Sequence, residues 1–186
     1  MQSSDSVDAT ERLKKMAAEK AYSYELNYHG CGQSALLAIQ ETLGLEDAQV
    51  FRAASCLTGG FPVEDRTCAA LIAGAMVIGM KLGRESVLEG QPGTSRGMRE
   101  LVRLVNRFKE AFGTTQCAKL TGGLTGGVVD EATLALMEEQ PELFEEPSQK
   151  VVEICVKHVS KAAELVVEIL SAEPSPNPPA AEAGLR

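Results

Sequence analysis

Residues 67–83 read TCAALIAGAMVIGMKLG, and this stretch decides the fold class. Alanine, glycine and aliphatic residues occupy every side of its helical projection, and its one charged residue lies near the end. A helix that is apolar all round is buried, because no face of it suits water. Thr67 is expected to be its N-cap, and Gly83 the residue that ends it. We therefore expect a buried central helix over about residues 67–83, closely approached by its neighbours.

Helical periodicity also dominates the rest of the chain, without a convincing β-hairpin signal. Apolar residues recur at helical spacing in six further segments. These are a helix that begins at Asp8 or Thr10, helices over about residues 31–43, 47–57, 98–112 and 147–170, and a weaker helix over 130–139. Residues 89–97 and 121–127 are rich in glycine or proline and are expected to be loops. The sequence predicts one all-α domain of six to seven helices over residues 1–171, followed by a disordered Pro/Ala-rich tail over 172–186.

The overall composition limits the classes of function. The 186 residues are 44% hydrophobic and 24% charged, which suits one globular domain. The net charge of −8 argues against nucleic acid or an anionic membrane surface as a partner. The N-terminus lacks the pattern of a secretory signal, and the longest apolar run, residues 68–80, is shorter than the roughly 20 residues of a membrane-spanning helix. We expect a cytoplasmic protein whose thiols stay reduced.

Cysteine provides the strongest chemical signal. Cys31 and Cys68 each lie where a helix is predicted to begin, Cys117 lies in the first turn of a short capped turn predicted at residues 114–117, and Cys155 lies on the apolar face of the last helix. A thiol in the first turn of a helix meets unpaired N–H groups and the positive end of the helix dipole, which favour the thiolate. Thiolates ligate metals and attack disulfides. Four such residues in one small acidic chain suggest a single redox or metal site.

Other interpretations of these residues stay open. Buried cysteine is a common packing residue, and this interpretation is strongest for Cys155. Cys56 falls near the end of its helix, where the dipole opposes a thiolate, so we expect a packing or peripheral thiol. His29, two residues before Cys31, is expected to be solvated, and His158 to pack at a helix interface. There is no C-x-x-C pair, which excludes zinc-finger, rubredoxin-like and thioredoxin motifs, so tertiary packing must assemble any shared site.

The order of these features resembles a family of redox-active proteins named for its cysteine pattern, C_GCAxxG_C_C. The stretches that carry the resemblance are GCGQSALLAIQETLG (30–44), the glycines of LTGGF (57–61), TCAALIAGAMVIGMKLG (67–83), FKEAFGTTQCAKLTG (108–122) and EICVKHVSKAAELV (153–166). The resemblance covers roughly residues 25–170. The chain departs from the pattern in the middle motif, where Thr67 replaces the leading glycine and Ile72 stands in place of the final one, with Gly74 two residues later. Cys56 is additional to the pattern.

The resemblance implies a small helical protein that acts through its cysteines, in redox chemistry or by holding a metal centre. The leading hypothesis is that Cys31, Cys68, Cys117 and Cys155 together bind an iron–sulfur cluster or another thiophilic metal, for electron transfer or redox sensing with a redox partner protein. A second is a thiol–disulfide oxidoreductase in which Cys68 or Cys31 is the nucleophile and a neighbouring cysteine resolves the disulfide. A third is a helical interaction module whose cysteines only pack. Whether the chain is an enzyme stays open.

Overall fold

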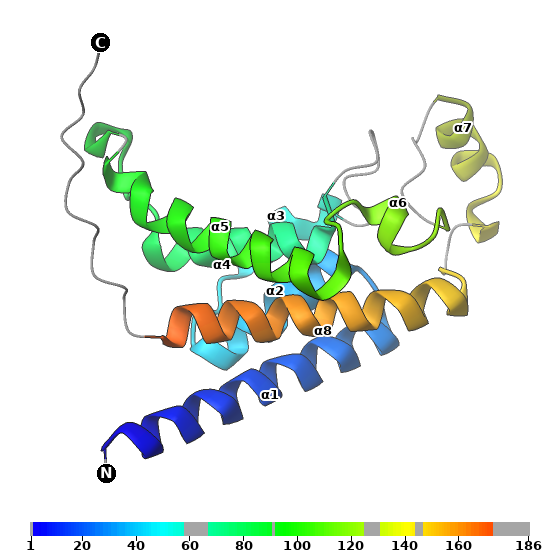
Figure 1. Ribbon diagram of the computed structural model, residues 1–186. Helices are drawn as coiled ribbons and strands as arrows, with labels where there is room; N and C mark the ends of the chain where they lie inside the picture. Colours follow the sequence, from blue (N-terminus) through cyan, green and yellow to red (C-terminus); the bar gives the residue numbers. More distant parts are fainter. Residues whose placement is uncertain (1, 58–66, 91, 125–130, 144–146, 173–186) are drawn as a thin grey trace.

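The computed structural model describes residues 2–57, 67–90, 92–124, 131–143 and 147–172 (Figure 1). Within these residues the chain is all-α, with eight α-helices and no β-strand. The helices are α1 (Gln2–Tyr28), α2 (Cys31–Leu43), α3 (Ala48–Ala53), α4 (Ala69–Leu82), α5 (Pro92–Phe112), α6 (Cys117–Leu120), α7 (Glu131–Glu139) and α8 (Gln149–Ser171), with short 3-10 helices η1 (Ala54–Leu57), η2 (Val87–Glu89) and η3 (Pro141–Leu143). Because α3 and α6 have only 6 and 4 residues, the six longer helices confirm the predicted fold class.

The long helices pack around α4 and α8. Helix α4 contacts α2, α5 and α8, and α8 also contacts α1 along much of its length. Figure 1 shows α1 and α8 side by side, with α4 and α5 on the other side of α8, and α7 standing away from the bundle at one end. Among the described residues, no helix has both the length and the hydrophobicity that crossing a membrane requires.

Helix α4 is the buried central helix that its composition predicts. Its buried residues lie between Ala69 and Ile78. The closest approach is at Gly74, where an added Cβ would lie 2.8 Å from Cγ2 of Val166 in α8 and 2.9 Å from Cδ2 of Leu104 in α5. Gly74 therefore supplies the close packing in this chain, although the pattern of the resembled family has its glycine two residues earlier.

Several helix boundaries agree with the sequence. Helix α2 spans Cys31–Leu43 and ends at Gly44, whose φ of 64° is the left-handed conformation that glycine adopts easily. The carboxylate of Asp47 caps α3 by accepting hydrogen bonds from the N–H groups of Gln49 and Val50. The predicted glycine stop at residues 59–60 and the predicted disordered tail from residue 173 onward lie outside the described residues.

Other boundaries differ from the prediction. Helix α1 begins at Gln2 rather than at Asp8 or Thr10. The prediction of a loop over residues 89–97 is wrong from Pro92, where α5 begins. Proline suits a first helical position because it has no N–H that would need a partner there. The N-cap of α4 is Cys68 rather than Thr67, because Thr67 forms an isolated antiparallel bridge with Gln116.

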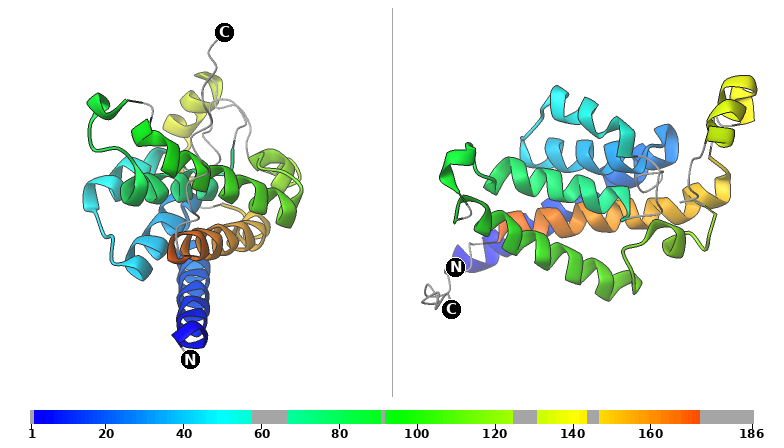
Figure 2. Two further views of the ribbon diagram at one scale, coloured as in Figure 1. Left: turned by 60° about the vertical axis from the view of Figure 1, so that its left-hand side comes forward. Right: turned by 90° about the horizontal axis from the view of Figure 1, so that it is seen from above.

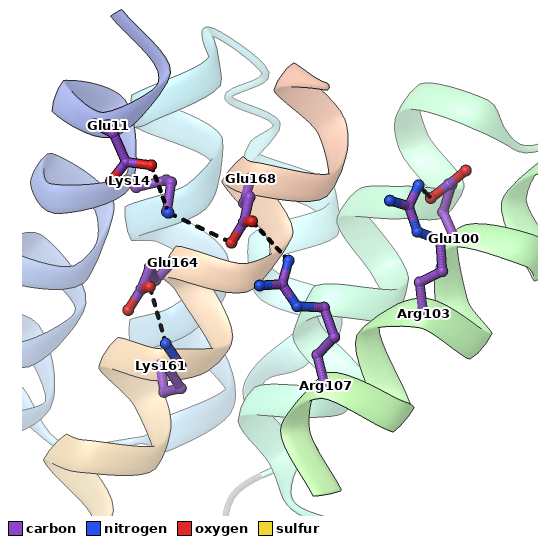
Figure 3. Close-up of polar contacts among 8 residues, drawn as sticks. All are labelled: Glu11, Lys14, Glu100, Arg103, Arg107, Lys161, Glu164 and Glu168. Atoms are coloured by element: carbon purple, nitrogen blue, oxygen red, sulfur yellow. Dashed lines mark hydrogen bonds and ion pairs between the residues drawn. The ribbon is translucent and has the colours of Figure 1, made fainter. Parts of the chain in front are cut away.

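Ion pairs link three of the long helices at one place on the surface (Figure 3). Glu168 of α8 lies 2.7 Å from Nη1 of Arg107 in α5 and 3.5 Å from Nζ of Lys14 in α1. Burial alone would raise the pKa of the Glu168 carboxyl, but Arg107 and Lys14 lower it, and the net pKa lies below its usual value. Glu168 is therefore ionised at neutral pH and joins α8 to both neighbours.

Candidate functional site

A short backbone bridge brings Cys68 and Cys117 together. Thr67 pairs with Gln116 in the antiparallel bridge, and the N–H of Cys68 donates a hydrogen bond to the carbonyl oxygen of Thr115 at 2.8 Å. Each cysteine directly follows one of the bridged residues. In this antiparallel pairing Cys68 lies across from Thr115, and the Cys68 thiol interacts electrostatically with that of Cys117. Two thiols far apart in the sequence therefore lie near each other, at the starts of α4 and α6.

Cys31 lies at the same end of the bundle, through a contact between α2 and α4. An added Cβ on Gly32 would lie 3.5 Å from Cβ of Ala69 and 3.0 Å from Cβ of Leu57. The first turns of α2 and α4 therefore touch, and Cys31 and Cys68 each lie one residue before this contact. Both residues are buried. Figure 2, seen from above, shows the starts of α2, α4 and α8 toward the same end of the molecule.

Cys155 approaches this group from α8. It interacts electrostatically with Cys68, Cys117 and Glu25. Burial raises the pKa of the Cys155 thiol to about 12, and the three acidic neighbours add to the effect. Cys155 is half-buried, so its side chain is more accessible than the apolar face of its helix suggests. The structure thus brings Cys68, Cys117 and Cys155 into one electrostatically coupled group, with Cys31 at the start of the adjoining helix.

Sequence reasoning missed Glu25, which joins this group from α1. The residue is only 5% exposed, and its Oε2 has no hydrogen-bond partner in the described part of the chain. Burial raises the pKa of the carboxyl to about 7, against the smaller opposing effects of Ser34 and His29. The Ser34 hydroxyl also donates to the carbonyl oxygen of His29 at 3.1 Å. A buried carboxyl with an unsatisfied oxygen beside thiols is unusual and needs an explanation.

A signal for Glu25 is present in the sequence. Ala17, Ala21 and Glu25 are four residues apart in succession, so they share one face of α1. Both alanines are fully buried. A carboxylate that continues a buried apolar stripe is expected to be buried as well. The spacing of Glu25 from Ala17 and Ala21 could therefore have identified Glu25 as a buried acidic residue.

The pKa of the Cys68 thiol is raised, contrary to the expectation from its place at a helix terminus. Burial raises the pKa of Cys68 to about 11. The N–H groups of Ala70 and Leu71 in the first turn of α4 lower this pKa, while Cys117 and Glu25 raise it further. The helix terminus therefore does lower the pKa of Cys68, but the loss of hydration on burial raises this pKa by more.

Cys56 and His158 lie outside this group, whereas His29 acts on Glu25. Cys56 lies on η1 and is exposed. Of the two roles predicted for it, packing residue or peripheral thiol, the structure supports the peripheral thiol. His158 is buried between α8 and α5, edge-on to Phe112 with ring centroids 4.6 Å apart, and burial lowers its pKa to about 4. The prediction of a packed interfacial histidine is confirmed. His29 is half-buried, with Nδ1 2.9 Å from the carbonyl oxygen of Glu25.

The donor set has a definite chemical preference. Thiolates suit iron–sulfur clusters and other thiophilic metals, and four cysteines are the usual protein ligands of such clusters. In the described residues, no three His, Cys, Asp or Glu side chains are arranged to hold a single metal ion. The residue types therefore suit a thiophilic metal, whereas their arrangement in the described residues does not form a metal-binding group.

Comparison with known proteins gives one match. A family model described as "Putative redox-active protein (C_GCAxxG_C_C)" matches residues 29–169. This span contains Cys31, Cys68, Cys117 and Cys155, whereas Glu25 precedes it. No curated protein and no solved structure matches the chain.

Proposed function

The chain belongs to the C_GCAxxG_C_C family of redox-active proteins, and we propose that Cys31, Cys68, Cys117 and Cys155 hold an iron–sulfur cluster in a cytoplasmic electron-transfer protein. The observation that carries this proposal is the coupling of buried Cys68 and Cys117 with Cys155 at the end of the bundle where Cys31 begins α2. When bound, a cluster would supply one-electron transfer to a redox partner protein.

The raised pKa values of Cys68 and Cys155 favour ligation over nucleophilic chemistry. A thiol with a pKa of about 11 is almost entirely protonated at neutral pH, and Cys68 is only 5% exposed. Such a group reacts slowly as a nucleophile, because the thiolate is the reactive form. A thiophilic metal replaces the proton on binding, so a high pKa does not prevent ligation. The N–H groups that face Cys68 would then stabilise charge on its sulfur.

The experiment that tests this proposal is purification without oxygen, followed by measurement of iron, sulfide and visible absorption. We expect the wild-type protein to contain both elements, directly or after reconstitution with iron and sulfide. Serine at position 31, 68, 117 or 155 should remove most of the iron. Cys56→Ser is the matched control, because Cys56 is exposed and outside the coupled group. Protein that gains neither iron nor colour on reconstitution would refute the proposal, as would full iron retention in all four variants.

A second candidate function is thiol–disulfide exchange, which the bridge between Thr67 and Gln116 favours because it makes Cys68 and Cys117 neighbours. The Cys68 thiolate would attack a disulfide of a partner protein, forming a mixed disulfide and releasing one partner thiol. The Cys117 thiolate would then attack the Cys68 sulfur and release the second partner thiol. The chain's two thiols are thereby oxidised and the partner's disulfide is reduced, with both protons passing to the partner's thiols. This function predicts a reversible Cys68–Cys117 disulfide in metal-free protein that takes up no iron.

A further inference from the structure

We propose that a pocket beside the start of α2 binds a small, uncharged aromatic compound that carries a ring hydroxyl group. The pocket lies between the end of α1, the first turns of α2, and α3. Its lining includes Tyr24, Tyr28, His29, Gln33, Ser34 and Phe51. No cysteine is among the described residues that line it, so the inference goes beyond the proposed function and needs no metal centre.

The first argument is the concentration of aromatic rings in this pocket. The whole chain contains only five phenylalanines and three tyrosines, and it has no tryptophan. Tyr24, Tyr28 and Phe51 nevertheless line one pocket. Tyr28 is 78% exposed, and its ring contacts that of Tyr24 with the centroids 6.4 Å apart and the planes tilted by 45°. A flat apolar ligand that covers such exposed ring faces removes them from water. The rings therefore favour a planar aromatic ligand.

The second argument is the fixed orientation of His29. Its φ of 60° is a left-handed conformation that residues other than glycine seldom adopt. Nδ1 of the ring lies 2.9 Å from the carbonyl oxygen of Glu25, and the carbonyl oxygen of His29 accepts a hydrogen bond from the Ser34 hydroxyl at 3.1 Å. Because a carbonyl oxygen only accepts, Nδ1 carries a hydrogen, and Nε2 of the neutral ring is an acceptor. The ring therefore offers a ligand an acceptor, which suits a hydroxyl group.

The volume and charge of the pocket narrow the class of ligand further. The volume is about 250 Å³, below the roughly 300 to 1,000 Å³ of pockets for drug-sized molecules, so one or two fused rings suit it. None of the described lining residues is Lys, Arg, Asp or Glu, and an uncharged ligand loses least on leaving water.

Two other polar groups of the lining already have partners. Nε2 of Gln33 donates to the carbonyl oxygen of Phe51 at 3.0 Å, and the Tyr24 hydroxyl donates to Glu41 at 2.8 Å. Nε2 of His29 is therefore the group that we expect to select a ligand hydroxyl.

The experiment titrates the purified full-length protein with β-naphthol by isothermal titration calorimetry. The methyl ether of β-naphthol is the matched ligand, because it has the same rings but no hydroxyl hydrogen. The variants are Tyr28→Ala, which removes an exposed ring, and His29→Asn, which removes the imidazole but keeps a residue type that tolerates positive φ. Tyr22→Ala is the control, because Tyr22 is 44% exposed on the same helix and is not among the residues that line the pocket.

We expect the wild type to bind β-naphthol about 3- to 10-fold more tightly than the methyl ether, which is the effect of one net hydrogen bond. His29→Asn should bind the two ligands with equal affinity, because it lacks the acceptor that distinguishes them. Tyr28→Ala should bind both ligands about 10-fold more weakly, because a stacking face is lost. Tyr22→Ala should match the wild type with both ligands.

Three results would overturn the inference. They are the absence of saturable binding to the wild type, equal wild-type affinities for the two ligands, and an equal loss of affinity in Tyr22→Ala and Tyr28→Ala. Melting curves show whether each variant is folded. If His29→Asn is not, the two ligands compared on the wild type and on Tyr28→Ala decide. The titration needs no iron, so its failure leaves the cluster proposal standing, and a failure of iron uptake leaves this inference standing.

Discussion

The N–H of Cys68 donates a hydrogen bond to the carbonyl oxygen of Thr115 at 2.8 Å, and this bond ties the start of α4 to the segment before α6. The connection is made by backbone atoms, so it does not depend on which side chains occupy these positions. It sets the positions of Cys68 and Cys117 before any metal or disulfide is present. The pair is therefore preorganised, which lowers the entropic cost of using both thiols in one site.

Alkylation of the metal-free protein should distinguish the exposed thiol from the buried ones. With iodoacetamide at neutral pH, we expect Cys56 to react first, because it is exposed. Cys68 and Cys155 should react far more slowly, since their pKa values are raised to about 11 and about 12. Peptide mass spectrometry at successive times measures the order. Equal rates at Cys56 and Cys68 would instead favour the thiol–disulfide function.

The close packing at Gly74 predicts opposite effects for two glycine substitutions in one helix. In Gly74→Ala the new Cβ meets Val166 and Leu104 at 2.8 and 2.9 Å, and overpacking of this kind costs about 1 to 3 kcal/mol. At Gly79 nothing lies within 4 Å of an added Cβ, so Gly79→Ala should stabilise the helix by up to about 1 kcal/mol. Urea unfolding measures both free energies. Equal shifts for the two variants would show that the helices relax around Gly74.

Acid should destabilise the protein partly through His158. Loss of hydration, with a smaller effect of Lys157, lowers the pKa of folded His158 from 6.5 to about 4. The unfolded chain therefore binds this proton first as the pH falls. The contribution of neutral His158 to stability is complete above pH 6.5 and is lost between about pH 6.5 and 4. His158→Phe, which keeps the ring packing against Phe112, should remove this part of the acid sensitivity in melting curves recorded over that range. An unchanged pH profile would contradict the assignment.

The ion pairs of Glu168 should contribute modestly to the free energy of unfolding, and this contribution should depend on salt concentration. Glu168 contacts Arg107 and Lys14 from a position where 28% of its side chain is exposed. Partly exposed pairs are worth up to about 1 kcal/mol, so Glu168→Gln should lower stability by no more than about that amount. The difference should shrink near 1 M salt, where screening acts over about 3 Å. Glu164→Gln is the control, because the ion pair of Glu164 with Lys161 lies within one helix. A loss for Glu168→Gln that does not change with salt would point to packing rather than charge.

The parts of the fold that depend on local pattern could be predicted from the sequence. Helix α2 and its glycine cap follow from periodicity and from the conformational freedom of Gly44. The burial of α4 follows from its composition. The start of α5 at Pro92 was not predicted, because proline and glycine together usually signal a loop, and here the proline occupies a first helical position.

The parts of the site that depend on tertiary contacts could not be predicted. The single bridge between Thr67 and Gln116 leaves no periodic pattern, so the pairing of the cysteines beside it was not visible. The sequence indicated the helix dipole at Cys68 but not the depth of burial that outweighs it. Glu25 was overlooked because one acidic residue hardly changes an apolar stripe, although its spacing from Ala21 reveals the shared face.

The exposed thiol of Cys56 gives the protein a natural attachment point for a fluorescent reporter. Cys56 neighbours Leu57, whose Cβ would lie 3.0 Å from a Cβ on Gly32, next to Cys31. A dye on Cys56 would therefore lie near the start of α2 without occupying a proposed ligand position. Because iron–sulfur clusters absorb visible light, loading would quench the dye's emission through energy transfer. The filling and emptying of the centre could then be followed in real time on the protein without any added cysteine.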